Sequence, residues 1–242
     1  MTQKFDLAGS LARGVGDRGQ AWTFIRDYAA DWLSPIEDGD GWPESELAAA
    51  EERLGVRLPA VLREAYALFG RRRDLVGNHD RLLAPAALHL DEAGRTLVFR
   101  HENQGAATWG VPLGDPRDDD PAVFIRLDLA DKAAERWEGW LDRLSLGFLE
   151  LVLSESLNAG GEVCDFLDPD DETAELLEEH CVPLAFPAYP TSAEEQATRW
   201  FLGPDVLIRS DDGMAVLARG RTAGDLERVR DLIPGDWLDD YR

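Results

Sequence analysis

The chain has 242 residues, of which 44% are hydrophobic and 30% are charged, as in ordinary soluble globular proteins. Its 48 acidic and 25 basic residues give a net charge of −23, which opposes binding to nucleic-acid phosphates and to anionic lipid. There is no apolar run of about 18 residues, and the first ten residues do not resemble a secretory signal, so we expect a cytoplasmic protein without a membrane span.

Motifs for catalysis or cofactor binding are not evident. The two cysteines, Cys164 and Cys181, are too few for a disulfide framework. Together with His180 they supply three possible zinc ligands, without a fourth at a recognisable spacing. The glycine-rich string Gly14–Gly19 lacks the hydrophobic strand that a dinucleotide site requires, so it predicts a flexible loop. The histidines, which we expect to be structural, are His79, His89, His101 and His180. We therefore predict no catalytic residue, no metal and no cofactor.

Residues 1–41 form an N-terminal segment in which one helix is predicted. Over Ala21–Leu33, apolar side chains recur at helical spacing and define one face. They are Trp22, Ile25, Ala29 and Trp32. Pro35 and the acidic residues after it end this helix.

A helical hairpin follows, because its start and stop signals are strong. Pro43 and Glu44 suit a helix N-terminus, and Gly55 suits a left-handed C-cap. Pro59 opens a second helix that Gly70 closes. The expected buried stripe of that helix is Leu62, Ala65, Tyr66 and Phe69.

Strands are predicted next, at Thr96–His101 and Ala122–Asp128, with the polar loop Gly114–Pro121 before the second. The polar side chains of Glu102–Gln104 either fix a turn through their own backbone or contact a ligand. A long helix is predicted over Leu141–Leu157. One face of it is apolar, except that the last position on this face is the acidic Glu155.

Residues 159–242 are predicted to form an acidic extension packed on the same domain. It contains a short helix at Thr173–His180 and a β-hairpin formed by Asp205–Arg209 and Met214–Arg219 around S-D-D-G. A closing helix covers Ala223–Ile233. The apolar content is small for an independent core, so we expect the hairpin to extend the sheet of the preceding domain. Because βα alternation is absent, the predicted class is α+β with a largely antiparallel or mixed sheet flanked by helices.

Two segments resemble one known family. The stretch L-G-V-R-L-P-A-V-L-R-E-A-Y-A-L-F-G (Leu54–Gly70), preceded by the acidic helix, is similar to the opening of the SMI1/KNR4 family of the SUKH superfamily. H-E-N-Q-G-A-A-T-W-G-V (His101–Val111) resembles its middle strand and turn, and Asp119–Arg126 resembles its next strand. Leu144–Leu157 is similar to its closing helix. The resemblance assigns an SMI1/KNR4-like core to residues 42–158.

The resemblance implies a non-enzymatic protein-binding module. Bacterial members are immunity proteins that neutralise toxins, often nucleases, by direct binding, and the family supplies no catalytic residues. An acidic inhibitor could cover the basic, phosphate-binding surface of such a toxin. Two alternatives stay open. One is a scaffold or regulatory protein with an endogenous partner, and the other is a hydrolase using paired carboxylates in a deep pocket.

The acidic residues are unevenly distributed, and this indicates where a basic protein would dock. No lysine or arginine occurs between Arg143 and Arg199, an interval that holds thirteen acidic residues, among them Glu194 and Glu195. Such a segment is either a solvated face or a docking surface. Our candidate docking residues are Asp118, Asp119 and Asp120 in one loop, and Asp165, Asp168, Asp170, Asp171 and Glu172 in another.

Overall fold

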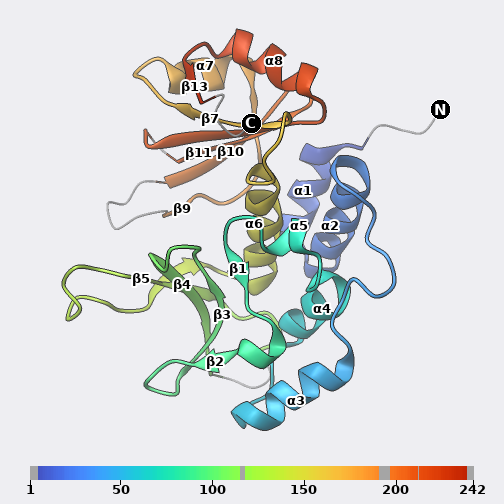
Figure 1. Ribbon diagram of the computed structural model, residues 1–242, viewed down its shortest axis with the longest axis vertical. Coiled ribbons are helices and arrows are strands. Elements are labelled where there is room, and N and C mark those ends of the chain that lie inside the picture. Colours follow the sequence, from blue (N-terminus) through green and yellow to red (C-terminus); the bar gives the residue numbers. More distant parts are fainter. Residues whose placement is uncertain (1–4, 115–117, 191–196, 212, 239–242) are drawn as a thin grey trace. The chain divides into compact units, whose positions relative to one another are not determined.

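A computed structural model describes residues 5–114, 118–190, 197–211 and 213–238, which fall into two compact units (Figure 1). The central unit is Asp17–Glu155, and the C-terminal unit is Ser156–Arg242 together with Met1–Gly16. Each unit combines helices with an antiparallel sheet, which confirms the α+β class in this general form. Among the described residues, no helix is both long enough and apolar enough to cross a bilayer.

The central unit contains one antiparallel sheet and a set of helices. Its helices are α2 (Arg18–Trp32), α3 (Glu44–Leu54), α4 (Ala60–Phe69), the short α5 (Arg73–Val76), the 3-10 turn η1 (Pro85–Ala87) and α6 (Leu144–Leu157), whose last two residues lie beyond the unit boundary. Its strands are β1 (Arg81–Leu82), β2 (His89–Leu90), β3 (Thr96–His101), β4 (Ala107–Pro112), β5 (Val123–Leu127) and β6 (Glu138–Leu141). They are ordered β1-β3-β4-β5-β6, and β2 also pairs with β3.

An aromatic cluster joins the helices of the central unit to its sheet. The ring of Phe148 in α6 lies 6.0 Å from Trp22 of α2 and 5.9 Å from Phe69 of α4, between centroids. It also lies 6.1 Å from Phe99 of β3. Since buried aromatic rings contribute large apolar areas, Phe148 is the centre of this core.

The predicted helical hairpin is confirmed. Gly55 adopts the left-handed conformation with φ of 69°, and its N–H donates to the Glu51 carbonyl over 2.9 Å. Only a residue without Cβ adopts this conformation at little cost, which explains the glycine. Pro59 immediately precedes α4, whose predicted stripe is buried.

The N-terminal segment differs from the prediction, because it contains two helices rather than one. The helix α1 spans Leu7–Gly16, and α2 begins at Arg18. The prediction of a flexible loop at Gly14–Gly19 is therefore wrong. Asp6 accepts a hydrogen bond from the Gly9 N–H over 3.0 Å, and Asp17 accepts one from the Gln20 N–H over 2.9 Å. These two aspartates begin successive helices, and their N-terminal bonds offset the low helix propensity of glycine.

The predicted helix at Leu141–Leu157 begins later than expected. Leu141 belongs to β6, where it pairs with Val123 of β5, and the helix starts at Leu144. A short apolar run fits a strand or a helix equally well, so only the pairing with β5 fixes this boundary.

The C-terminal unit contains a second antiparallel sheet. Its helices are α1, α7 (Thr173–His180) and α8 (Ala223–Leu232). Its strands are β7 (Cys164–Asp168), β8 (Val182–Pro183), β9 (Tyr189–Pro190), β10 (Ala197–Gly203), β11 (Val206–Asp211), β12 (Ala215–Gly220) and β13 (Asp236–Trp237). They are ordered β13-β7-β12-β11-β10-β8, with β9 beside β10.

The predicted hairpin is present as β11 and β12, but it does not extend the first sheet. Its strands pair with β10 and β7 instead, so the expectation of one shared sheet is wrong. A separate core lies beneath α7 and α8, formed by Leu167, Leu177, Cys181, Phe201, Val206, Ile208, Val216, Ala218, Leu226, Val229 and Ile233. Leu167 of β7 and Phe201 of β10 belong to this core. Neither of these strands was predicted from the sequence. Asp212, Glu194 and Glu195 lie outside the described residues.

We predict that Thr222→Ala destabilises the C-terminal unit by about 1 kcal/mol, because Thr222 is the N-cap of α8. Its hydroxyl accepts from the Asp225 N–H over 3.2 Å, and Asp225 accepts from the Thr222 N–H over 2.9 Å. Urea unfolding measures the loss. Thr23→Ala, on an exposed part of α2, serves as the control and should change stability far less. Equal effects of the two substitutions would contradict the capping role.

Candidate functional site

A buried ionic cluster lies within the central unit. The Arg100 guanidinium donates to Asp80 Oδ2 over 2.9 and 2.5 Å and to Glu150 Oε2 over 2.5 Å. The ring centroids of Trp109 and Trp140 lie 4.2 and 5.8 Å from its central carbon. Arginine suits this position because its planar group forks toward carboxylates and stacks on aromatic rings. We name Asp80, Arg100, Glu150 and Glu155 the Arg100 cluster.

Glu155 organises the loop above this cluster. Its carboxylate accepts hydrogen bonds from three successive backbone N–H groups, those of Asn78, His79 and Asp80. The last two bonds are 2.7 and 2.9 Å long. Successive N–H groups that converge in this way form a concave anion-binding turn. The carboxylate therefore fixes the bend from which His79 and Asp80 project.

The cluster holds three carboxyl groups and one guanidinium, so negative charge is in excess. Burial raises the pKa of Glu155 from 4.5 to about 7, against the N–H groups of His79 and Asp80 and the charge of Arg100, which lower it. Burial alone would lower the pKa of Arg100, but Glu150 and Asp80 hold it above its usual value. Arg100 therefore remains charged, while Glu155 titrates near neutral pH.

We predict that stability falls as the pH rises from about 4.5 to about 7, by at most about 3 kcal/mol for Glu155 alone. The folded protein holds its proton to a higher pH than the unfolded chain, so the contribution is complete below the unfolded pKa and lost as pH passes the folded pKa. Urea unfolding at several pH values measures this slope. Glu155→Gln mimics the protonated group and should flatten it, whereas an unchanged slope would contradict the assignment.

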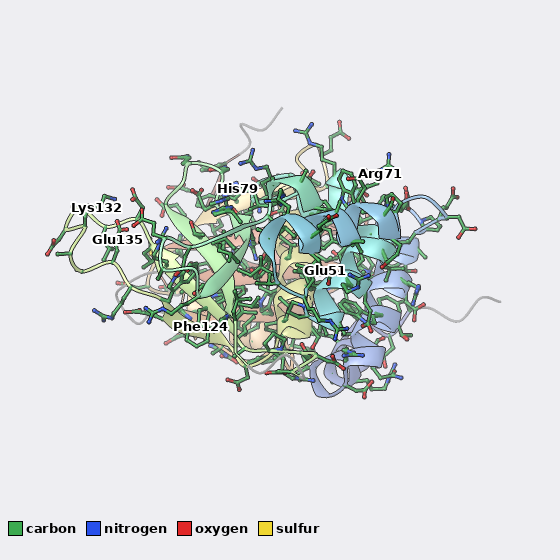
Figure 2. All side chains as sticks on the ribbon, turned by 90° about the horizontal axis from the view of Figure 1, so that it is seen from below. Glu51, Arg71, His79, Phe124, Lys132 and Glu135 are labelled. Carbon is green, nitrogen blue, oxygen red and sulfur yellow. The ribbon has the colours of Figure 1, made fainter. Side chains whose placement is uncertain are left out.

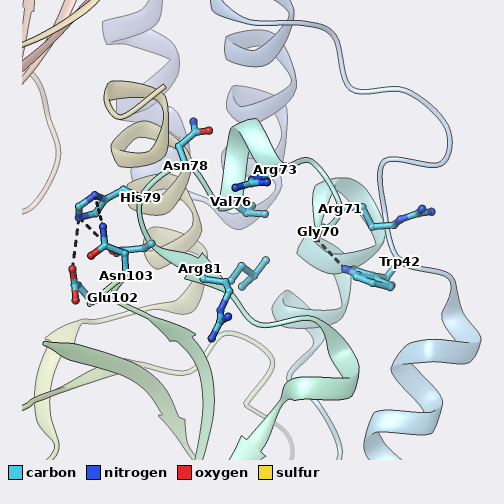
Figure 3. Close-up of a pocket in the computed structure, with 13 residues that line it drawn as sticks. Trp42, Gly70, Arg71, Arg73, Val76, Asn78, His79, Arg81, Glu102 and Asn103 are labelled. Carbon is cyan, nitrogen blue, oxygen red and sulfur yellow. Dashed lines mark hydrogen bonds and ion pairs between the residues drawn. The ribbon is translucent and has the colours of Figure 1, made fainter. Parts of the chain in front are cut away.

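A cleft of about 580 Å³ opens on the central unit beside the Arg100 cluster (Figure 3). Three of its side chains approach one another: His79 Nε2 lies 3.9 Å from Asp80 Oδ1 and 3.8 Å from Glu102 Oε1. Asn103 Nδ2 lies 3.0 Å from His79 Nδ1. Arg71, together with Arg73 and Arg81, lines other parts of the cleft. The His79 side chain is about half-exposed, in contrast to the buried Asp80.

Strand register explains why these residues meet. In the antiparallel pair of β1 and β3, Arg81 lies opposite His101. Continuing this register past the strand ends brings Asp80 to Glu102 and His79 to Asn103. Glu102 also fixes the following turn, because its Oε2 accepts from the N–H groups of Gln104 and Ala106 over 2.7 and 2.9 Å. The turn predicted at Glu102–Gln104 is thus confirmed.

Other charged side chains of the central unit make local pairs outside this cleft. Lys132 pairs with Asp128 and with Glu135 on the loop after β5. Figure 2 shows Lys132 and Glu135 together on this loop, at the side of the view opposite to Arg71. These exposed ion pairs contribute little stability and converge on no cavity, so they are not a candidate site.

The first predicted docking loop has a largely structural role. Asp120 accepts hydrogen bonds from the Ser145 N–H and hydroxyl over 2.8 and 2.7 Å, in the first turn of α6. The Asp119 carbonyl accepts from the Val61 N–H in the first turn of α4. Acidic residues at helix N-termini complement the helix dipole. The side chains of Asp118 and Asp119 are exposed and border a groove of about 670 Å³, but Asp120 is committed to α6.

The second predicted docking loop is mostly exposed, with one exception. Asp165 lies in β7, is only 6% exposed and pairs with Arg230 of α8, so it offers no free carboxylate. The exposed members are Asp168, Asp170, Asp171 and Glu172. Asp170 also accepts from the Thr173 hydroxyl and N–H, which fixes the start of α7.

The acidic surface continues along α7. Glu175, Glu178 and Glu179 are exposed, and Arg199 pairs with Glu178. We name Asp168–Glu179 the acidic segment. It leads into the edge strand β8, where Val182 is 60% exposed. Val182 therefore adds one exposed apolar side chain that follows a run of acidic residues in the sequence.

Comparison with family models, curated proteins and solved structures finds no match to this chain.

Proposed function

We propose that the protein is a non-enzymatic binding module of the SMI1/KNR4 type that neutralises a basic toxin domain by direct contact. Local similarity supports the family assignment: the hairpin of α3 and α4, the strands β3 to β5 and the helix α6 occur in the expected order. The assignment rests on these short motifs, because no wider match accompanies them.

The acidic segment is the observation that carries the binding proposal. It exposes Asp168, Asp171, Glu175 and Glu179 in a stretch of sequence without any lysine or arginine. Glu172, Glu175 and Glu179 follow helical spacing, so they lie along one face of α7, from its N-cap to its last turn. Opposite charge on a partner would steer encounter and select against acidic proteins.

The expected mechanism is occlusion of the partner's functional surface. A nuclease binds phosphates mainly through lysine and arginine, so its active-site cleft is basic. The acidic segment could cover such a cleft and exclude the nucleic acid, while Val182 adds apolar contact at the rim. No residue of this protein then needs to carry out chemistry.

Co-expression with a toxin domain encoded beside its gene tests this proposal. The protein should restore growth of cells that produce the toxin, and a variant that neutralises the acidic segment should not. The segment variant carries Asp168→Asn, Asp171→Asn, Glu175→Gln and Glu179→Gln. The control variant, with the same change in net charge on exposed positions of the central unit, carries Asp27→Asn, Glu46→Gln, Glu52→Gln and Glu92→Gln.

Rescue by the wild type and the control variant, but not by the segment variant, would support direct neutralisation through the acidic segment. Equal rescue by both variants would assign binding to another surface. Absence of both rescue and binding would contradict the immunity role and favour the scaffold alternative, in which the partner is an endogenous protein.

A further inference from the structure

We propose that His79, Asp80 and Glu102 bind a divalent transition-metal ion in the cleft of the central unit. The ligand atoms would be His79 Nε2, one oxygen of Asp80 and one of Glu102, which all lie within 4.8 Å of one another. This inference is independent of the proposed function, because the acidic segment belongs to the other unit.

The distances between the ligand atoms are close to those of a metal site. A tetrahedral zinc ion with bonds of about 2.0–2.1 Å holds its ligand atoms about 3.4 Å apart. Here His79 Nε2 lies 3.9 Å from Asp80 Oδ1 and 3.8 Å from Glu102 Oε1. All three atoms lie within 4.8 Å of one another, so they must move closer together to bind an ion, and the half-exposed His79 ring on its bend can contribute to this movement.

Asp80 supplies the strongest indication of a ligand. Its side chain is only 7% exposed, and Oδ2 accepts two of the hydrogen bonds that Arg100 donates. Among the described residues, the buried Oδ1 has no hydrogen-bond partner, and it is directed toward His79 Nε2. A buried carboxylate oxygen without a partner is costly, and coordination to a cation would remove that cost.

The other two ligands are held by their second polar atoms. Glu102 Oε2 is occupied by the N–H groups of Gln104 and Ala106, which leaves Oε1 facing His79. Asn103 contacts His79 Nδ1, which leaves Nε2 facing the carboxylates (Figure 3). For metal binding, the Asn103 amide would turn so that its oxygen accepts from Nδ1–H. Such outer contacts orient the ligands of natural metal sites.

The two carboxylates that face the site favour a cation. Asp80 and Glu102 face it directly and Glu150 lies behind it, whereas Arg100 is bound to Asp80 and Glu150, and Arg71, Arg73 and Arg81 line other parts of the cleft. The mixed set of one imidazole and two carboxylates suits zinc, iron or manganese better than magnesium or calcium, which prefer oxygen alone. Three protein ligands leave room for a further ligand from the cleft, such as water.

Zinc titration of the full-length chain, after treatment with a chelator and dialysis, tests the site. Isothermal titration calorimetry should give one Zn²⁺ per chain with micromolar or tighter affinity. His79→Ala and Glu102→Gln should each weaken binding by more than about 100-fold, since loss of outer contacts alone costs about 10–100-fold. Glu102→Gln keeps an oxygen for the turn, and circular dichroism verifies that each variant is folded.

Two histidine controls make the result specific. His180→Ala, in the C-terminal unit, should leave zinc binding unchanged. His89→Ala should do the same, although His89 stacks on His101 with centroids 5.5 Å apart and offers an alternative pair of nitrogen donors. The inference is overturned if folded wild-type protein binds no zinc in the micromolar range, if either ligand variant binds like wild type, or if His89→Ala abolishes binding.

Discussion

Replacing Arg100 by methionine is expected to lower the free energy of unfolding of the central unit by about 3–5 kcal/mol. The substitution keeps an apolar chain of similar length but removes the cation that neutralises Asp80 and Glu150, which are 6% and 2% exposed. Two buried carboxylates would then lose their cationic partner, and a buried uncompensated charge is among the most destabilising changes known. Contacts of the guanidinium with Trp109 and Trp140 would be lost as well.

Urea unfolding followed by tryptophan fluorescence measures this effect, with Arg136→Met as an exposed control that should change stability by less than about 0.5 kcal/mol. Adding Glu150→Gln to Arg100→Met should recover part of the loss, because it removes one of the two orphaned charges. A loss below about 1 kcal/mol for Arg100→Met would show that the cluster is not an essential part of the core.

The second large effect is expected from Glu155→Ala, which should cost about 3 kcal/mol or more. Three backbone N–H groups, those of Asn78, His79 and Asp80, would lose their acceptor at once. The loop that presents His79 and Asp80 to the cleft would lose its fixed bend. The stability loss should therefore be accompanied by weaker zinc binding.

Urea unfolding and zinc titration of the same variant measure both consequences. Glu46→Ala, at an exposed position of α3, is the matched control and should leave both quantities near their wild-type values. Unfolding of Glu155→Ala at the same urea concentration as wild type would contradict the organising role of Glu155. It would mean that water replaces the carboxylate as acceptor for the three N–H groups.

Elements with strong local signals could be predicted from sequence. The hairpin of α3 and α4 follows from Pro43, Gly55 and Pro59, whose backbone preferences act within one or two residues. The strand β3 and the helix α7 also have the predicted bounds, and α7 begins where Asp170 accepts from the Thr173 N–H. In each case, the deciding interactions are close in sequence.

The second sheet could not be predicted from local pattern, because its strands depend on distant partners. In β7, Asp165 interrupts the apolar residues, and its pairing with Arg230 of α8, distant in sequence, helps to stabilise a buried aspartate there. This interaction also explains why Asp165 does not belong to the docking surface. Asp120 was likewise predicted to be a docking residue, but its carboxylate binds Ser145 at the start of α6, a contact that the local sequence does not indicate.

The cleft was missed because no short motif encodes it. His79 and Glu102 meet through the register of β1, a strand of two residues that is too short to recognise in a sequence. One signal was present: Glu150 and Glu155 lie within the apolar run of α6. Glutamates inside a buried helix require a cation or donors elsewhere in the fold, and here Arg100 and the loop at Asn78 supply them.

The most direct test of the proposed binding function is the association rate between this protein and a toxin domain, if one is encoded beside its gene, measured by stopped-flow fluorescence over a salt series. A charge-steered complex should form more slowly as salt increases, and the segment variant should associate at least about 10-fold more slowly than the control variant at low salt. Equal association rates for the two variants, or no association at any salt concentration, would contradict docking through the acidic segment.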